Sequence, residues 1–219
     1  IGAAAAVLFA VNVTAVLPAV PANLGVFQAA CVAVLGAYGV GNADALAYDR
    51  PPEAYHHARL LDHARGDWAD TIARRFLYEL ADEARLASIG PGWPPLANLV
   101  EKLRREERYH RMHATVWIDR LANGGTEPRG RLDSALAALT PDAATVFTPL
   151  AGEAELLEAG ILTRPLAAAE ATWRADLTSI LVPLGLRVPP GTGAPVDGRT
   201  NHSDAFRWLW GEFTTVRRL

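Results

Sequence analysis

The sequence predicts an all-α protein, a bundle of helices preceded by an apolar helical hairpin. Apolar residues recur every three or four positions over several long segments, which is the period of an amphipathic helix. Clusters of glycine and proline separate these segments, as expected where a chain passes from one helix to the next. No segment of useful length alternates apolar and polar residues, so the sequence contains no pattern for a β-strand.

The first 43 residues carry no charge, because Asp44 is the first charged residue of the chain. Two apolar runs, residues 1–17 and 24–40, flank a short segment that contains Pro18, Pro21 and Asn23. Each run is close to the roughly 17 residues that a helix needs to cross the hydrocarbon core of a bilayer. We therefore expect residues 1–43 to be a separate domain and a transmembrane hairpin. The alternative is a buried hairpin in a soluble bundle, although bundle helices normally keep a polar stripe.

Residues 44–219 form the second predicted domain, and all the charge of the chain lies in it. The net charge of -3 and the scattered histidines leave no basic face, so nucleic acid is not an expected partner. The single cysteine, Cys31, excludes an internal disulfide framework and a cysteine-based zinc site. We expect this domain to be cytoplasmic, with membrane association arising only through residues 1–43.

A strong helix is predicted over residues 67–86. Asp67 stands in the N-cap position, where its carboxylate can accept hydrogen bonds from the first free backbone N–H groups. The apolar face of this helix consists of Trp68, Ile72, Phe76, Leu80 and Ala84. Glu79 lies beside that face. The glycines and prolines between residues 90 and 95 end the helix and let the chain reverse.

A second long helix is predicted over residues 96–121, antiparallel to the first. Its inward stripe is Leu96, Val100, Leu103, Glu107, His110, Ala114, Trp117 and Leu121. Glu107 and His110 are three residues apart, so their side chains point the same way and should face the bundle interior. Helix bundles offer such a Glu-x-x-His pair to metal ions, and a hydrogen-bonded polar pair without metal is the alternative. The antiparallel packing should also bring Glu79 towards this pair.

Further helices are predicted along the rest of the chain. A turn over residues 123–131 leads into an apolar stripe that starts at Leu132. Thr140 followed by a proline predicts a new helix start, and Thr163 is expected to cap another helix. Residues 152–161 are expected to be a short connection, and the last helix should begin near residues 200–203. The histidines at positions 56, 57 and 63 are expected at the surface, because adjacent histidines on a helix face different ways.

Several sequence blocks resemble one family. These blocks are DWADTIARRF at residues 67–76, EERYH at 106–110 with Trp117 beyond it, and RLANGGTE at 120–127. They resemble the C-subunit family of bacterial ring-1,2-phenylacetyl-CoA epoxidase complexes, and residues 41–48 and the tail from His202 to Phe206 fit it more loosely. The resemblance covers residues 41–219 and implies a ferritin-like helical bundle. The bundle would be incomplete, because the charge-free run replaces its leading pair of helices.

The resemblance also implies a role in phenylacetate breakdown. In the complexes of this family, the di-iron centre and the acyl-CoA site are in a separate, related subunit, while a reductase supplies electrons from NADPH. The reaction is oxygen insertion into the aromatic ring of phenylacetyl-CoA. The protein resembled here is the structural partner of the catalytic one. We therefore expect this chain to hold no cofactor, to pack against the catalytic di-iron subunit, and to associate with itself when that subunit is absent.

The candidate metal ligands of the chain agree with a non-catalytic role. A di-iron bundle uses a Glu from each of two helices and a Glu-x-x-His from each of two others. The predicted helices supply one such motif, Glu107 with His110, and one lone candidate, Glu79. Further polar candidates in the tail are His202, Asp204 and Glu212. Ala205 stands where the family shows a second histidine, and an incomplete ligand set cannot hold two bridged irons.

Two other functions remain as alternatives. The first is a metal-binding, ferritin-like enzyme in its own right, which metal analysis of residues 44–219 would reveal. The second is a fragment of an integral membrane protein fused to unrelated sequence. Residues 1–40 suggest it, because they resemble a late transmembrane segment of flippase-like, lysylphosphatidylglycerol-synthase-type proteins.

Overall fold

The computed structural model describes residues 51–149, 152–191 and 193–215. Its α-helices are α4 (Trp68–Leu86), α5 (Pro94–Asn123), α6 (Thr126–Leu139), α7 (Glu153–Glu158), α8 (Leu166–Leu181) and α9 (Asp204–Thr214). Its 3-10 helices are η1 (Pro52–Ala54), η2 (Arg59–Asp62) and η3 (Thr140–Phe147). In this part of the chain, β-type pairing is limited to one isolated bridge between Ile89 and Leu162. The all-α fold is thus confirmed, whereas the predicted hairpin of residues 1–43 lies outside the described residues.

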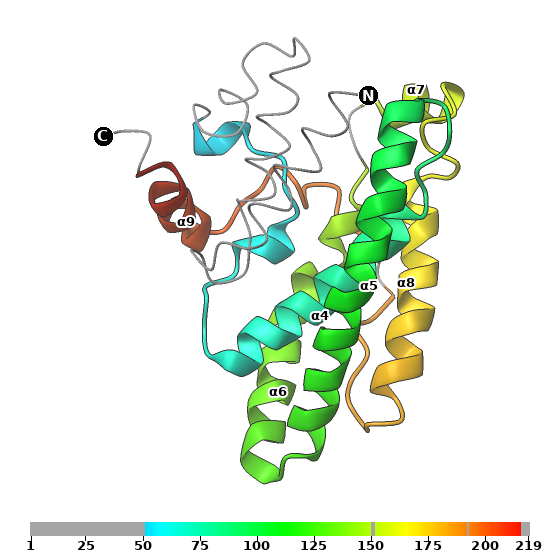
Figure 1. Cartoon of the computed structure of the whole chain (residues 1–219). Helices are drawn as coiled ribbons and strands as arrows, with labels where there is room; N and C mark the ends of the chain where they lie inside the picture. Colours follow the sequence, from blue (N-terminus) through cyan, green and yellow to red (C-terminus); the bar gives the residue numbers. More distant parts are fainter. Residues whose placement is uncertain (1–50, 150–151, 192, 216–219) are drawn as a thin grey trace. The chain divides into compact units, whose positions relative to one another are not determined.

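The described residues fall into two compact units. Residues 56–203 form the larger unit, with helices α4 to α8 and the 3-10 helices η2 and η3 (Figure 1). The described residues 51–55 and 204–215 belong to the smaller unit, which contains η1 and α9. None of the helices in these ranges combines the length and the hydropathy needed to span a membrane.

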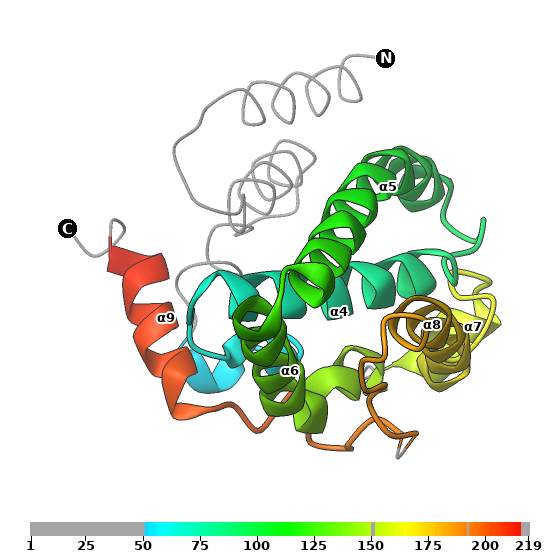
Figure 2. The ribbon, with the colours of Figure 1, turned by 90° about the horizontal axis from the view of Figure 1, so that it is seen from below.

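Helix α4 is the central element of the larger unit. It packs against α5, α6 and α8, and seen from below it lies between α5 and α8 (Figure 2). Its start agrees with the prediction, because the Asp67 carboxylate accepts hydrogen bonds from the backbone N–H groups of Ala69 and Asp70 at 2.7 and 3.1 Å. The Asp70 carboxylate accepts one from the Asp67 N–H at 2.8 Å. This capping box satisfies N–H groups that a helix otherwise leaves unpaired.

Most of the predicted apolar face of α4 is buried. Four of its members are at most 3% exposed: Ile72, Phe76, Leu80 and Ala84. Trp68, in the first turn, is 49% exposed and contacts the Trp117 ring of α5 edge-on, with ring centroids 5.2 Å apart. The buried face therefore begins at Ala69, which is 3% exposed, one residue later than predicted.

Helix α5 confirms the predicted second long helix. Its fully buried residues are Val100, Ala114, Ile118 and Ala122. Trp117 and Leu121, which were predicted to face inward, are only partly buried and pack against the edge of the core. The inward stripe in the last two turns therefore lies one residue later than the sequence pattern predicted.

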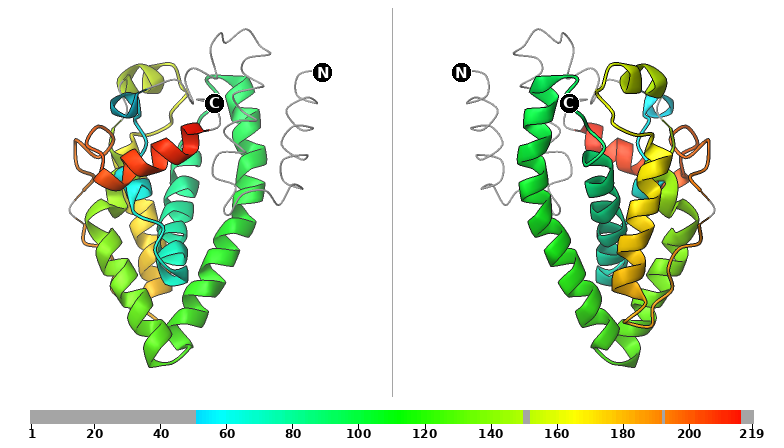
Figure 3. Two further views of the ribbon diagram at one scale, coloured as in Figure 1. Left: turned by 90° about the vertical axis from the view of Figure 1, so that its left-hand side faces the viewer. Right: turned by 90° about the vertical axis from the view of Figure 1, so that its right-hand side faces the viewer.

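A tight turn joins α5 to α6, and Figure 3 shows the two helices meeting at a sharp bend. Gly125 in this turn has a φ of 101°, which glycine adopts at little cost. Helix α6 begins at Thr126, so the predicted turn over residues 123–131 is longer than the observed one.

Backbone hydrogen bonds connect the turn between α4 and α5 to the segment that follows α7. The backbone N–H groups of Gly90 and Gly92 donate hydrogen bonds to the carbonyl oxygens of Ile161 and Gly160 at 2.8 and 3.0 Å. A Cβ atom at Gly92 would collide with the carbonyl oxygen of Ala159. Glycine is therefore required where these two backbones approach each other most closely. We call this pair of backbone contacts the glycine clasp.

A helix does begin at the predicted Thr140, as the 3-10 helix η3, but the caps predicted at Thr140 and Thr163 are both wrong. The Thr140 hydroxyl donates to the Leu136 carbonyl oxygen at 2.7 Å, and the chain continues from α6 directly into η3. The Thr163 hydroxyl donates to the Ser88 carbonyl oxygen at 3.1 Å, and α8 begins only at Leu166. Each hydroxyl thus donates a hydrogen bond to a carbonyl oxygen of an earlier residue instead of capping the next helix. The predicted connection over residues 152–161 also contains a helix, α7.

The larger unit has a hydrophobic core of its own. The residues of this core, including those partly buried at its edge, lie between Ala58 and Ala194. Trp173 fixes α8 on α4, because its fully buried indole donates from the ring N–H to the Leu77 carbonyl oxygen at 3.1 Å. In the smaller unit, Phe206 of α9 contacts the Tyr55 ring edge-on, with centroids 5.6 Å apart.

Candidate functional site

Two groups of histidine and carboxylate side chains in the larger unit have donor atoms close enough to bind one ion. The first, which we call the carboxylate cluster, consists of Glu79, Glu107 and His110. The second, the histidine cluster, consists of His57, Asp62 and His202. In each cluster the donor atoms lie within 4.8 Å of one another.

The antiparallel packing of α4 and α5 forms the carboxylate cluster, as the sequence predicted. His110 Nδ1 lies 3.4 Å from Glu107 Oε2 and 3.9 Å from Glu79 Oε2. Arg75, one turn before Glu79 on α4, donates from Nη2 to Glu79 Oε1 at 2.7 Å. Glu107 Oε2 is buried and accepts no hydrogen bond from the described residues. The cluster is therefore a network of ion pairs around a partly satisfied carboxylate.

The three side chains of the carboxylate cluster are buried to different degrees. The Glu79 and Glu107 side chains are 8% and 17% exposed, whereas the His110 side chain is 46% exposed. The prediction that Glu107 and His110 both face the bundle interior is therefore correct for Glu107 and wrong for His110. In this turn of α5 the following residue, Arg111, is less exposed than His110, so the inward face lies one residue later than predicted.

Burial and mutual repulsion separate the pKa values of the two carboxylates. Burial and the neighbouring Glu107 carboxylate raise the pKa of Glu79 from 4.5 to about 7. Burial acts in the same direction on Glu107, but the interaction with His110 outweighs it and lowers the pKa of Glu107. The Glu107 carboxylate in turn raises the pKa of the His110 imidazole. These shifts favour the charged forms of Glu107 and His110, beside a Glu79 whose pKa of about 7 leaves it partly protonated near neutral pH.

The carboxylate cluster contains only half of a di-iron ligand set. Such a set needs two Glu-x-x-His motifs and two further Glu residues from four helices. The residues outside the described ranges contain neither glutamate nor histidine, so a second motif would have to come from the described part. In this structure the donors of the cluster do not fit a bridged pair of irons.

A second Glu-x-x-His spacing does exist in the sequence, and our sequence prediction overlooked it. Glu53 and His56 are three residues apart, but η1 ends at Ala54 and Tyr55 is extended, with φ and ψ of -86° and 143°. The two side chains therefore do not project from adjacent turns of one helix. This motif does not supply the missing half of the ligand set.

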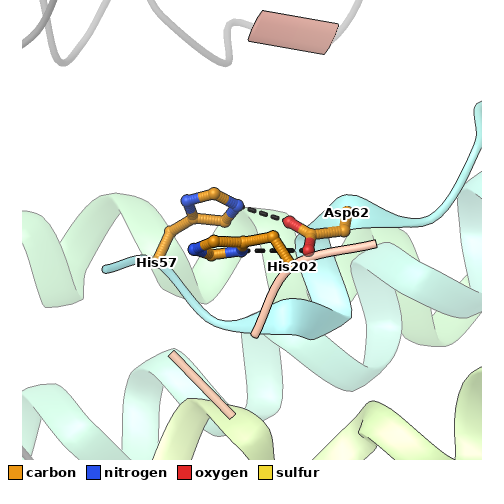
Figure 4. Close-up of side chains that lie close together, drawn as sticks. All are labelled: His57, Asp62 and His202. Atoms are coloured by element: carbon orange, nitrogen blue, oxygen red, sulfur yellow. Dashed lines mark hydrogen bonds and ion pairs between the residues drawn. The ribbon is translucent and has the colours of Figure 1, made fainter. Parts of the chain in front are cut away.

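The histidine cluster joins two distant segments of the larger unit (Figure 4). Asp62, at the end of η2, is fully buried, and its two carboxylate oxygens face different imidazoles. Oδ1 forms a short contact with His57 Nε2, and Oδ2 lies 3.0 Å from His202 Nδ1. The two imidazole rings are stacked, with centroids 4.3 Å apart and an interplanar angle of 19°. The Ser203 backbone N–H donates to Asp62 Oδ2 at 2.9 Å.

The prediction that the histidines of residues 56–63 are surface residues is wrong for His57 and His63. Besides the contact of His57 with Asp62, His63 Nε2 lies 2.9 Å from Asp142 Oδ2. The His57 and His63 side chains are 24% and 26% exposed. The surface argument failed because this segment is not a regular helix: the extended residues around η2 let both side chains turn inward.

Asp62 is the functional candidate that the sequence did not reveal. Burial alone would raise the pKa of its carboxyl group, but the bonds from His57 and the Ser203 N–H outweigh burial and lower it. Asp62 and His202 are 140 residues apart, and no short motif connects them. The tail candidate His202 is thus placed in a cluster, whereas Asp204 and Glu212 are exposed on α9 and belong to neither cluster of the described residues.

Comparison with known proteins assigns the chain to a family. The family described as "Phenylacetic acid catabolic protein" matches residues 29–219. The chain belongs to this family. A relative within the phenylacetic acid catabolic family is the C subunit of the 1,2-phenylacetyl-CoA epoxidase of Escherichia coli (strain K12). The two sequences are 28% identical over 183 residues, which cover 83% of this chain and 73% of the relative.

The match to the phenylacetic acid catabolic family confirms the family that the sequence blocks predicted. It begins at residue 29, earlier than the predicted residue 41, and so includes part of the second apolar run. The resemblance of residues 1–40 to flippase-like proteins receives no support from the comparisons.

Proposed function

We propose that this chain is a structural subunit of a multicomponent di-iron monooxygenase that epoxidises the ring of phenylacetyl-CoA in phenylacetate catabolism. Membership of the phenylacetic acid catabolic family and the similarity to the C subunit of an epoxidase support this function. The di-iron centre and the acyl-CoA site would lie in a separate catalytic subunit. This chain would stabilise the active conformation of that subunit without binding a di-iron cofactor itself.

The incomplete ligand set of α4 and α5 is the observation that carries this proposal. Three donors of the ferritin-like arrangement are in place, Glu79, Glu107 and His110. Arg75 donates a hydrogen bond to one oxygen of Glu79. Its positive charge partly compensates the negative charge that a bound metal ion would otherwise neutralise. An internal network of ion pairs thus partly compensates the charge of carboxylates that would bind iron in a catalytic relative.

An exposed apolar stripe on α5 supports a role in assembly of the complex. Tyr109, Met112 and Val116 are 61%, 58% and 43% exposed, and their spacing places them on one face of the helix. Contiguous exposed apolar residues of this kind usually mark a partner surface. We assign this surface, the α5 stripe, to the catalytic di-iron subunit. Aromatic residues elsewhere are also exposed, Trp68 at 49% and Trp208 at 62%, whereas Trp173 is fully buried.

Co-purification with the catalytic subunit tests the α5 stripe. Met112→Asp should reduce recovery of the catalytic subunit at least about tenfold, because a charge replaces an apolar contact in the interface. Val182→Asp is the matched control, since Val182 is similarly exposed, at 57%, but lies at the end of α8. Equal recovery with both variants, or equal loss, would show that the α5 stripe does not bind the catalytic subunit.

Metal analysis and sedimentation test the structural assignment itself. The complex should contain iron in proportion to its catalytic subunit, and the separate chain should contain no stoichiometric iron. The separate chain should also associate with itself, because its α5 stripe is then uncovered. Stoichiometric iron that is lost in Glu107→Gln would replace our proposal with the alternative of a metal-binding enzyme. If the separate chain is a stable monomer and does not bind the catalytic subunit, the proposed role in assembly is excluded.

A further inference from the structure

The histidine cluster contains a buried negative charge without a permanent positive partner. Asp62 is 0% exposed, and its ion pairs within the described residues are to His57 and His202 only. The nearby Arg59 is paired with another carboxylate, that of Asp142, at 2.6 Å. A buried carboxylate is costly unless a positive charge compensates it.

The donor atoms of the histidine cluster are close to the spacing that one metal ion requires. Nitrogen and oxygen ligands lie about 2.0 to 2.2 Å from zinc, so two ligands of one ion are at most about 4.4 Å apart. The imidazole nitrogens and the carboxylate oxygen of the cluster lie within 4.8 Å of one another. In Figure 4 the two stacked imidazole rings lie on the same side of the Asp62 carboxylate, and each directs one nitrogen towards it. A small rearrangement, in which the hydrogen-bonded nitrogens and oxygens move slightly apart, would place all three groups around an ion.

The carboxylate of the cluster is held in position by a further hydrogen-bonding residue. The Ser203 N–H donates to Asp62 Oδ2 at 2.9 Å, and the Ser203 hydroxyl donates to the Asp62 backbone carbonyl at 3.3 Å. Such outer hydrogen bonds orient metal-binding carboxylates and increase their affinity. The His57 side chain is 24% exposed, so the cluster can be reached from solvent and a water molecule can complete the coordination.

We propose that His57, Asp62 and His202 bind one divalent transition-metal cation of the zinc class. Two imidazoles, one carboxylate and a water provide the four ligands of a tetrahedral zinc site. The ion would neutralise Asp62 and connect η2 to the segment before α9, two regions 140 residues apart in sequence. Because the ion would bind the folded chain and not the unfolded one, it would stabilise the larger unit. This site is separate from the carboxylate cluster and does not depend on the proposed function.

Calorimetric titration of the full chain with Zn²⁺, after removal of bound metal by a chelator, tests the proposal. We expect one equivalent to bind, and His57→Gln and His202→Gln each to weaken the affinity about tenfold or more. His63→Gln is the matched control, because His63 lies in the same segment but contacts Asp142. Glu107→Gln is the second control, since it removes a donor of the carboxylate cluster. Both controls should bind Zn²⁺ as the unchanged chain does.

Zinc X-ray absorption of the unchanged chain covers the case in which the variants do not fold. The proposal requires two imidazole ligands in the spectrum, together with oxygen ligands. No saturable binding, binding that survives both His57→Gln and His202→Gln, or binding abolished by Glu107→Gln would each overturn it.

Discussion

His110 lies at the solvent edge of the carboxylate cluster, and its exposure determines what it contributes to stability. Its side chain is 46% exposed, and its contact with Glu107 is 3.4 Å long. An ion pair with such an exposed partner contributes little, because water solvates the imidazole when the pair is broken, and the positive charge of Arg75 still stabilises the Glu107 carboxylate. A large destabilisation, expected if His110 were a core residue, is therefore not predicted from the structure.

We predict that His110→Ala lowers the free energy of unfolding by less than about 1 kcal/mol. Leu80→Ala, at a position on α4 that is 1% exposed, should lower it by about 2 to 5 kcal/mol. Urea unfolding of the two variants under the same conditions provides the comparison. A similar loss in both would mean that His110 is a structural part of the core.

Glu79 makes the stability of the molecule depend on pH near neutrality. Its folded-state pKa of about 7 is above the ordinary 4.5, so protons bind more tightly to the folded state. The contribution of Glu79 to the free energy of unfolding is therefore fully present below pH 4.5 and is lost as the pH rises through about 7. Above that pH, folding must keep a buried carboxylate beside Glu107.

We therefore predict that the unchanged chain becomes less stable between pH 5 and pH 8, and that the Glu79→Gln variant does not show this decrease. The free energy of unfolding of the variant, relative to that of the unchanged chain, should increase over this range by on the order of 1 to 2 kcal/mol. Denaturant titrations at several pH values measure the difference. The opposite slope would mean that Arg75, and not burial, dominates the energetics of Glu79.

At the residue scale, the sequence was informative where the functional groups share one helix. The spacing of Glu107 and His110, together with the antiparallel helix carrying Glu79, was enough to predict the carboxylate cluster. Asp62 could not be found in this way, because its partners lie at both ends of the larger unit. Only the folded backbone brings His57 and His202 to the same carboxylate.

At the scale of elements, helix positions were easier to predict than helix ends. The long apolar stripes located α4 and α5, since the period of three to four residues is repeated over many turns. Thr140 and Thr163 misled the prediction because a threonine hydroxyl can bond to an earlier carbonyl as readily as it can cap a helix. The short helix α7 lacks enough turns to show a period at all.

The glycine clasp leads to a prediction about two glycines of similar chemistry but different surroundings. Gly92→Ala should destabilise the molecule by about 1 to 3 kcal/mol, because its Cβ would collide with the Ala159 backbone. Gly130→Ala should instead be neutral or stabilising by up to about 1 kcal/mol. Gly130 lies within α6, and an added Cβ there meets nothing within 4 Å.

Thermal unfolding of both glycine variants measures these effects. A Gly92→Ala variant as stable as the unchanged chain would show that the two backbones can separate without cost. The Gly130→Ala result serves as the control for the general effect of replacing glycine by alanine.

At the scale of the whole molecule, the hydrophobic core found among the described residues consists of residues of the larger unit. The core lies between Ala58 and Ala194, and the compact unit runs from residue 56 to residue 203. A unit that buries its own apolar surface should fold without the rest of the chain.

We predict that a chain of residues 56–203 unfolds in one cooperative transition, at a temperature close to that of the same transition in the full chain. Circular dichroism during heating measures it, and a matched chain of residues 56–186 is the control, because it lacks His202 and Arg199. Arg199 is 8% exposed and donates to the Val146 carbonyl oxygen at 2.7 Å. The shorter chain should melt earlier, whereas gradual melting of the longer one would contradict the prediction.

The glycine clasp also has a consequence for the order in which the chain becomes structured. Helices α4 and α5 are adjacent in sequence, so they can pair as soon as both have left the ribosome, through local contacts that form quickly. The amides of Gly90 and Gly92, however, obtain their acceptors from Gly160 and Ile161, which are synthesised after α6, η3 and α7. Until then these amides can bond only to water. In native hydrogen exchange, the two amides should therefore lose their protection together with the α7 region and not with the helix pair whose turn they occupy.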